Sequence, residues 1–216
     1  MIPGDDSRLY AVALGRQATA PVETITLEGR GTRLVPLTAE QVDALSAIGL
    51  EPKLWQSTTI RVTTRQEMAA YVQTALEAQR DGTALPFTIV ERASNTIVGT
   101  SRFHGYAPEH RRLEIGFTWI SLPWQKTFVN TESKYLMLRQ AFEGYGCIRV
   151  EFKADAGNEA SRRALLRIGA KPEGVLRNYR ISEHLGIRDL AVFSIIASEW
   201  PGVKKTLEQR LHPYEA

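Results

Sequence analysis

Hydrophobic and polar positions along this chain follow two different periods, and the changes of period divide it into elements. Alternating or continuously apolar runs between turn residues predict strands at residues 24–27, 33–37, 86–91, 96–103, 111–120, 147–153, 172–183 and 187–197. Apolar residues three and four apart predict helices at residues 39–47, 64–80, 130–144, 158–169 and from 198 onward. Thr64-Arg-Gln-Glu67 is a capping box at the start of the second helix, and Asn158 is a suitable N-cap for the fourth. Strands come first, then strand–helix–strand–helix, then a hairpin, and this order predicts an α/β protein with a mixed sheet.

The predicted strand at residues 111–120 carries the most regular alternation. Its two faces hold Leu113, Ile115, Phe117 and Trp119 on one side and Glu114, Gly116 and Thr118 on the other. A glycine in the middle of a strand is typical of a β-bulge, and Gly116 fits one.

The chain has 216 residues, which is enough for one domain with a full core. Residues 1–23 mix Pro, Gly, Asp and Ala without a period, so we expect a flexible extension there. We expect residues 24–216 to form a single domain.

Composition narrows the classes of function. The net charge of +3 is spread along the chain, which favours a solvated surface over nucleic-acid binding. No apolar run approaches the roughly 20 residues that span a membrane. The single cysteine, Cys147, excludes an internal disulfide and fits a reducing cytoplasm, and it is expected to be a small buried hydrophobe. We expect no metal and a cytoplasmic protein.

Two strand–helix junctions carry the chemistry. The strand around residues 114–120 leads through a short loop to a helix that is expected to open at Asn130, and a second strand leads to Asn158 and another helix. A helix N-terminus at the end of a strand binds anions, because unpaired N–H groups and the helix dipole point the same way. A ligand with a phosphate at one end would reach both strand ends.

This order resembles the GNAT superfamily of N-acetyltransferases over residues 30–211, and is most similar to the branch of the ribosomal-protein-alanine and -serine N-acetyltransferases. The residues that carry the resemblance are Ile97-Val-Gly-Thr100, Glu114-Ile-Gly-Phe-Thr-Trp119, Pro123-Trp124, Asn130-Thr-Glu132, Asn158-Glu-Ala-Ser161, Ile168-Gly-Ala170, Glu173-Gly174 and Ser198-Glu-Trp200. The resemblance implies a GNAT-like fold with a mostly antiparallel sheet of about seven strands flanked by helices. It also implies acetyl-CoA as co-substrate.

By the same resemblance, the loop before the helix holds the coenzyme diphosphate. The family frame falls on residues 125–130; the leading Gln125 matches, but Phe128 and Asn130 fill both glycine positions. Backbone N–H groups do most of the cradling, so the loop can still function. The expected coenzyme-binding residues are Thr118, Trp119, Ile120, Gln125, Lys126, Thr127, Phe128, Val129, Asn130, Thr131 and Asn158.

Acetyl transfer to an amine needs a group that removes a proton from the amine. Glu114 is the first candidate, with an exposed sheet carboxylate as the alternative, and His104 is the second. In the family, the residue three after the Asn158 position or a later Tyr protonates the leaving thiolate; Leu165 occupies the Tyr position, so only Ser161 could serve.

Trp55, Trp124 and Tyr179 lie outside the periodic faces and are candidates for the wall of an acceptor site, with ordinary packing as the alternative. The expected function is direct transfer of acetyl from acetyl-CoA to a primary amine, either a protein N-terminus or a small molecule. The alternative is a non-catalytic coenzyme-binding or regulatory module on the same fold. A nucleotide-binding domain of another class is disfavoured, because no Gly-x-Gly-x-x-Gly occurs. A homodimer is left open.

Overall fold

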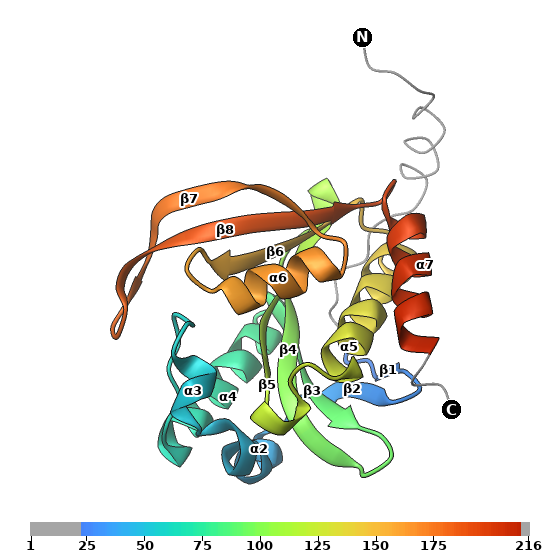
Figure 1. Cartoon of the computed structure of the whole chain (residues 1–216). Coiled ribbons are helices and arrows are strands. Elements are labelled where there is room, and N and C mark those ends of the chain that lie inside the picture. Colours follow the sequence, from blue (N-terminus) through green and yellow to red (C-terminus); the bar gives the residue numbers. More distant parts are fainter. Residues whose placement is uncertain (1–22, 213–216) are drawn as a thin grey trace.

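The computed structural model describes residues 23–212 (Figure 1). The predicted extension at residues 1–23 lies outside this range except for its last residue. The strands are β1 (Leu27–Glu28), β2 (Thr32–Pro36), β3 (Ala84–Glu91), β4 (Thr96–Ala107), β5 (Arg112–Ile120), β6 (Arg149–Asp155), β7 (Lys171–Ser182) and β8 (Gly186–Ile196). The helices are α2 (Val42–Gly49), α3 (Pro52–Trp55), α4 (Arg65–Arg80), α5 (Phe128–Arg139), α6 (Glu159–Arg167) and α7 (Trp200–Leu211).

The strands form one mixed sheet in the order β1-β2-β3-β4-β5-β6-β8-β7. Only β5 and β6 are parallel, and every other neighbouring pair is antiparallel. The predicted mostly antiparallel sheet is therefore confirmed. The sheet has eight strands, so the expected number of about seven is wrong by one.

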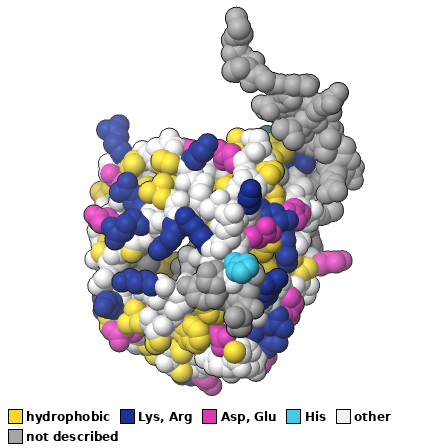
Figure 2. All heavy atoms as spheres, turned by 45° about the vertical axis from the view of Figure 1, so that its right-hand side comes forward, with side chains coloured by type: hydrophobic (Ala, Val, Ile, Leu, Met, Phe, Trp, Pro, Cys, Tyr) yellow, Lys and Arg dark blue, Asp and Glu magenta, His cyan; other side chains and the backbone are white. Residues whose placement is uncertain are grey.

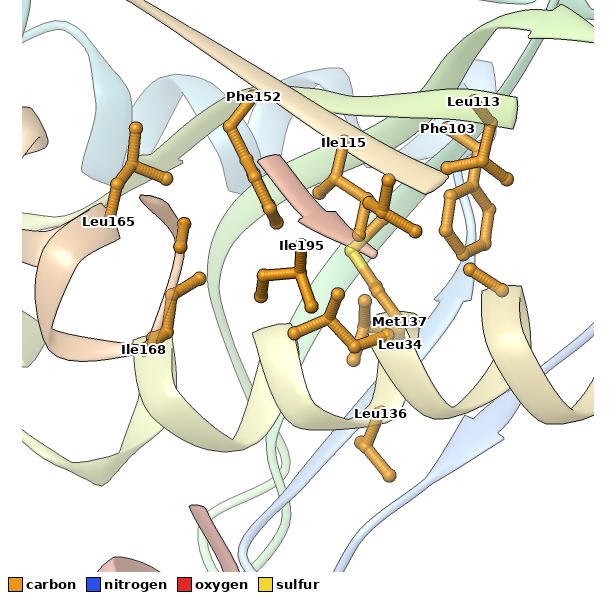
Figure 3. Close-up of a cluster of buried hydrophobic side chains, with 14 of the residues drawn as sticks. Leu34, Phe103, Leu113, Ile115, Leu136, Met137, Phe152, Leu165, Ile168 and Ile195 are labelled. Atoms are coloured by element: carbon orange, nitrogen blue, oxygen red, sulfur yellow. The ribbon is translucent and has the colours of Figure 1, made fainter. Parts of the chain in front are cut away.

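Helices cover both faces of this sheet (Figure 1). One face packs against α5 and α6, with α7 beside α5, and their side chains form the larger hydrophobic cluster. In Figure 3, Met137 of α5 and Leu165 of α6 point toward Ile115 and Phe152 of the central strands. The other face packs against α2 and α4 and forms a second cluster that includes Trp55, Met68 and Trp119. The sheet therefore separates two sides of the molecule with different helices.

The best-predicted helix is α4. Thr64 Oγ1 accepts a hydrogen bond from Glu67 N, and the Glu67 carboxylate accepts one from Thr64 N, which confirms the predicted capping box.

Two other helical predictions need correction. The predicted helix at residues 39–47 is a 3-10 turn, η1 (Ala39–Gln41), followed by α2, and the irregular stretch at residues 49–63 contains the one-turn helix α3 with Pro52 in its first turn.

Helix α5 begins at Phe128, two residues before the predicted start at Asn130. Thr127 is its N-cap, because Thr127 Oγ1 accepts a hydrogen bond of 3.3 Å from Val129 N. The prediction missed this cap because Asn130 is an equally good capping residue by type.

The regular alternation along β5 breaks at Phe117, which has a φ of +51°. The β4–β5 register shifts between Arg102 and Thr100, so one extra residue of β5 is accommodated as a bulge. Leu113 and Ile115 share one face of the strand as predicted, and this face packs against α5. The predicted position of Phe117 and Trp119 on that same face is wrong, because the extra residue turns them to the α4 side and turns Thr118 and Ile120 toward α5.

Strands β5 and β6 pair only at their beginnings. The parallel ladder joins Arg112–Glu114 to Arg149–Glu151, and no pairing between the two strands follows. Figure 1 shows the two strands diverging beyond this point. The β6-facing main-chain groups of β5 after Glu114 therefore lack a strand partner.

On the face shown in Figure 2, Lys and Arg side chains alternate with Asp and Glu side chains and with apolar residues. No large area of a single charge forms there, in agreement with the spread-out charge of the sequence. No helix within residues 23–212 is long and apolar enough to cross a membrane.

Candidate functional site

The loop between β5 and α5 is held open by its own side chains. Ile120 O accepts a hydrogen bond of 3.0 Å from Gln125 Nε2, and Thr127 Oγ1 donates one of 2.8 Å to Trp124 O. Lys126 takes a left-handed conformation, with a φ of +63°, which turns the chain sharply into the helix. The first N–H groups of α5 consequently point out of the helix end beside the end of β5.

The bulky residue at the first family glycine position does not fill this loop. The Phe128 ring lies against the turn between β1 and β2, where a Cβ atom on Gly31 would collide with it. Val129 is fully buried, and Asn130 is partly buried in the first turn of α5. Gln125 and Lys126 are both exposed, but the Gln125 amide is already bonded to Ile120 O, so Lys126 is the side chain that can reach a ligand on the surface. These positions fit a diphosphate held mainly by backbone N–H groups.

A buried carboxylate in α5 holds the turn between β1 and β2 against the helix. Glu132 accepts hydrogen bonds from Arg30 N at 2.6 Å, Gly31 N at 3.1 Å and Thr32 Oγ1 at 2.8 Å. The turn between β1 and β2 is thereby fixed to the start of α5. Sequence reasoning placed Glu132 in a family motif but did not find this contact, since its partners lie about a hundred residues away.

At the second junction, Asn158 uses both ends of its amide. Its Oδ1 accepts a hydrogen bond of 3.0 Å from Ser161 N, which confirms the predicted cap of α6. Its Nδ2 donates a hydrogen bond of 3.0 Å to Ser57 O. Asn158 thus connects the end of β6 to the segment after α3.

Asp155, at the end of β6, anchors the same corner. Arg188 of β8 forms two hydrogen bonds of 2.7 Å with the two Asp155 oxygens, and Gly157 N donates a third at 2.9 Å. The paired guanidinium lowers the pKa of Asp155, although burial opposes the shift. No pattern in the sequence pointed to this pair.

The two predicted proton acceptors lie together on the α4 side of the sheet. His104 Nε2 is 3.4 Å from Glu114 Oε1, and Lys153 Nζ is 2.6 Å from Glu114 Oε2. Glu114 is only 7% exposed, so the alternative of an exposed sheet carboxylate is wrong. His104 also explains Gly116, because a Cβ atom there would collide with the imidazole.

Burial and nearby charges tune this cluster. Burial lowers the pKa of His104, and the charges of Arg102, Lys153 and Arg180 lower it further, against the opposing effect of Glu114. Burial alone would lower the pKa of Lys153, but the hydrogen bond and charge of Glu114 raise it. His104 is therefore a neutral base at neutral pH, and Lys153 a cation.

The bulge in β5 adjoins this cluster. The Phe117 ring meets the His104 ring edge-on, with 5.0 Å between their centroids, and Tyr71 OH donates a hydrogen bond of 3.2 Å to Phe117 O. On the opposite side of the sheet, Lys134 Nζ of α5 lies 2.5 Å from Thr118 Oγ1. Lys134 is buried, and this burial lowers its pKa to about 7. Sequence reasoning missed Lys134, which falls on the helix face expected to be apolar.

The structure separates the remaining predicted residues. Ser161 lies beyond the end of β6, in the first turn of α6. Glu114 pairs with Glu151 of β6. Glu151 is four residues before the end of that strand, and these four residues span about 13 Å along it. Among the expected coenzyme-binding residues, Trp119 has its side chain buried on the α4 side, so only its main chain can face the gap.

The three candidate wall residues do not converge. Trp55 is 3% exposed, packs 5.7 Å from Trp119 between centroids and donates a hydrogen bond of 2.7 Å to Gly49 O, so it is a core residue. Trp124 packs against the larger cluster, and Tyr179 is 48% exposed on β7.

A pocket of about 280 Å³ lies on the α4 side instead. Residues 60–62, α4 and the bulge enclose it, with Tyr71, Arg102 and Phe117 in its wall. It adjoins the His104–Glu114 cluster through Phe117. Arg102 was not found from the sequence, because an arginine in a strand is ordinarily a surface residue.

Comparison with known proteins agrees with this geometry. A family model of the acetyltransferase (GNAT) domain matches residues 32–171. The N-acetyltransferase YoaA of Bacillus subtilis, whose function is uncharacterised, is 30% identical over 131 residues, which cover 61% of this chain and 73% of YoaA.

Solved structures share the fold. A GCN5-related N-acetyltransferase from Brucella melitensis superposes with a TM-score of 0.81 at 28% identity, covering 88% of this chain and 86% of the other. Mycobacterium smegmatis RimJ in complex with CoA-disulfide has a TM-score of 0.74 at 21% identity, covering 89% and 97% of the two chains, and therefore shows the fold alone. The strand–loop–helix junction, the parting strands and the family match lead to one conclusion: the chain belongs to the GNAT family and is an acyltransferase enzyme.

Proposed function

We propose that the protein transfers the acetyl group of acetyl-CoA directly to a primary amine, without a covalent enzyme intermediate. The observation that carries the proposal is the gap between β5 and β6. The open N-terminus of α5 lies at one end of β5, and the buried His104–Glu114 pair lies near the point where the strands part. An anion-binding end and a proton-accepting end thus share one strand.

In this proposal the first-turn N–H groups of α5 and residues 125–131 hold the coenzyme diphosphate. Unpaired main-chain donors around the β5 bulge orient the thioester carbonyl and stabilise the oxyanion that forms on it. The amine nitrogen attacks the carbonyl carbon, the carbon–sulfur bond breaks, and the thiolate leaves with a proton. Ser161 remains the candidate donor of that proton.

The geometry favours His104 over Glu114 as the immediate proton acceptor. Glu114 already binds Lys153 through Oε2, and its Oε1 lies 3.4 Å from His104 Nε2, which leaves the other ring nitrogen, Nδ1, to accept the proton of the amine. Glu114 then orients the ring and balances the imidazolium that forms on it, as carboxylates commonly do for catalytic histidines. This reverses the order of the two candidates expected from the sequence.

The structure does not support the reason for proposing a non-catalytic module. That alternative rested on bulky residues at the glycine positions, but the Phe128 ring lies against Gly31 rather than in the loop. For the acceptor, the resemblance to the ribosomal-protein N-acetyltransferase branch favours a protein N-terminal amine over a small molecule. Cytoplasmic location, one domain over residues 24–216, the absence of nucleic-acid and membrane partners, and a homodimer stay predictions.

Thiol release tests the proposal. The protein is incubated with acetyl-CoA and a panel of peptides and small amines, and free CoA thiol is measured over time. We expect acceptor-dependent release that His104→Gln lowers by about 100-fold, since a positioned base contributes that order of rate. Calorimetry with acetyl-CoA provides the second measurement, and no heat of binding at millimolar ligand would overturn the proposal.

A further inference from the structure

The 280 Å³ pocket on the α4 side contains a buried cation with no anion of its own. Arg102 is 6% exposed, which is rare for an arginine. Its guanidinium carbon lies 3.9 Å from the centroid of the Phe117 ring and 5.3 Å from that of Tyr71. Within residues 23–212 no carboxylate forms an ion pair with Arg102.

Contact with two rings does not replace the water that this guanidinium loses. A buried charge is normally paired and hydrogen-bonded, and cation–π contact recovers only part of the cost of desolvation. The rings fix the plane of the guanidinium and leave its N–H groups at the edge, where they form part of the pocket wall. A fixed planar fork of donors is suited to two parallel hydrogen bonds with a carboxylate.

The other charged residues of the pocket do not satisfy Arg102. Arg61 is exposed and has the same sign. Glu67 is occupied by the cap of α4, where Glu67 Oε2 accepts from Thr63 N at 2.6 Å and from Thr64 N at 3.0 Å. The pocket therefore presents a net positive charge inside walls that are otherwise largely apolar.

The place of Arg102 in the sheet relates it to the proposed chemistry. Arg102 and His104 lie two residues apart on the same side of β4, which puts their Cα atoms about 7 Å apart. Phe117 touches both side chains. The coenzyme diphosphate is not a suitable occupant, because the start of α5 lies on the opposite face of the sheet.

We propose that Arg102 binds a carboxylate of the acceptor, so that the preferred acceptors are amines that carry a carboxylate a few bonds from the amino group. The inference rests on the proposed function and names its acceptor class. A neutral apolar acceptor of the same size would bury the guanidinium unpaired and would bind more weakly. The carboxylate can come from an acidic first residue of a peptide or from the α-carboxylate of a free amino acid.

Two matched pairs of probes separate these sources. The peptides Glu-Ala-Ala-amide and Gln-Ala-Ala-amide differ in the side-chain carboxylate, and free glutamine and glutamine α-amide differ in the α-carboxylate. Binding of each probe is measured by calorimetry with CoA present, and kcat/KM is measured with acetyl-CoA. We expect wild-type protein to prefer the carboxylate member of at least one pair by tenfold or more in both measurements.

Arg102→Gln should abolish this preference, measured as the ratio of kcat/KM between the two members of a pair, because a general change in activity affects both members and cancels in the ratio. Arg102→Lys keeps a cation without the planar fork and should retain part of the preference. Arg61→Gln is the matched control for a charge in the same pocket and should leave the preference unchanged. Melting temperature and affinity for CoA check that each variant is folded.

Equal binding of both members of both pairs by wild-type protein would overturn the inference, as would a preference that persists in folded Arg102→Gln. Carboxylate binding that depends on Arg102 without any acetyl transfer would have a different meaning. It would count against the proposed function and would support the pocket as a carboxylate site.

Discussion

Single residues decide how the site is charged. Glu114, His104 and Lys153 come from three different strands and form one buried cluster, in which Glu114 and Lys153 shift the pKa of His104 and Glu114 raises the pKa of Lys153. The sequence identified the first two as candidates because their residue types accept protons. It did not identify Lys153, because its partner is 39 residues away on a neighbouring strand.

The carboxylate of Glu114 is expected to matter for turnover even though it is not the immediate base. Glu114→Gln removes the charge that stabilises imidazolium at His104, so kcat should fall by about 100-fold in the thiol-release assay. Glu151→Gln is the matched control, because Glu151 Oε2 also approaches Lys153, at 3.7 Å, whereas the carboxylate beside His104 is that of Glu114. Equal losses in both variants would assign the effect to Lys153 instead.

The lowered pKa of His104 sets the pH dependence of the reaction. A base with a lowered pKa is neutral above that pKa, so its contribution persists below pH 6.5 and is lost only on further acidification. The measurement is kcat from pH 5 to 9 at saturating acceptor. His104→Gln corrects for the titration of the acceptor amine, and a wild-type profile that fell already above pH 7 would contradict the assignment.

The buried amine of Lys134 should make stability depend on pH. Burial lowers its pKa from the ordinary value of 10.5 to about 7 in the folded protein, so between these values the unfolded state binds more protons. Its contribution to the free energy of unfolding therefore rises with pH, by roughly 2 kcal/mol between pH 7 and 9. Urea unfolding of wild type and Lys134→Met compares the two slopes, and parallel slopes would show that Lys134 remains charged inside the protein.

At the scale of elements, the start of α5 and the bulge of β5 shape the gap for the coenzyme. At both places the residue favoured by the local sequence differs from the residue that the tertiary contacts select. Asn130 and Thr127 are both capable caps, and the packing of Phe128 against Gly31 accompanies the earlier start. The bulge was predicted at Gly116, but the residue with the left-handed backbone is Phe117, whose ring is held by Arg102 and His104.

The cap of α5 can be tested by Thr127→Ala. Loss of the Oγ1 acceptor for Val129 N should lower the free energy of unfolding by about 1 kcal/mol. Because the same turn is proposed to hold the diphosphate, affinity for acetyl-CoA should fall as well. Asn130→Ala is the control for stability, and a larger loss of stability in that variant would restore the cap predicted from the sequence.

Across the whole molecule, the segment after α3 is held by groups distant in sequence. Asn158 Nδ2 binds Ser57 O at 3.0 Å, and Ser182 Oγ donates to Thr59 O at 3.1 Å. Residues 60–62 continue from this segment into the wall of the acceptor pocket. Asn158 therefore links the start of α6 to the segment that continues into the proposed acceptor pocket.

Asn158→Ala should release this segment. The variant loses the cap of α6, at a cost of about 1 kcal/mol, together with the donor to Ser57 O. Hydrogen exchange followed by mass spectrometry should show faster exchange at residues 56–63 than in wild type. Asn158→Asp keeps the capping oxygen and loses only the donor, so exchange at residues 56–63 that stays slow in this variant would contradict the proposed link.

The sequence by itself determined the order of elements, the mixed and mostly antiparallel sheet, the caps at Thr64 and Asn158 and the family. These depend on local periodicity and residue type, which act over a few positions. The tertiary structure alone decided that Glu114 is buried beside His104 and Lys153, that Trp55 belongs to the core, and that Arg102 and Lys134 are buried cations. The physical reason is that burial and charge pairing depend on neighbours brought together by the sheet, where one extra residue in β5 changes the face of every side chain that follows.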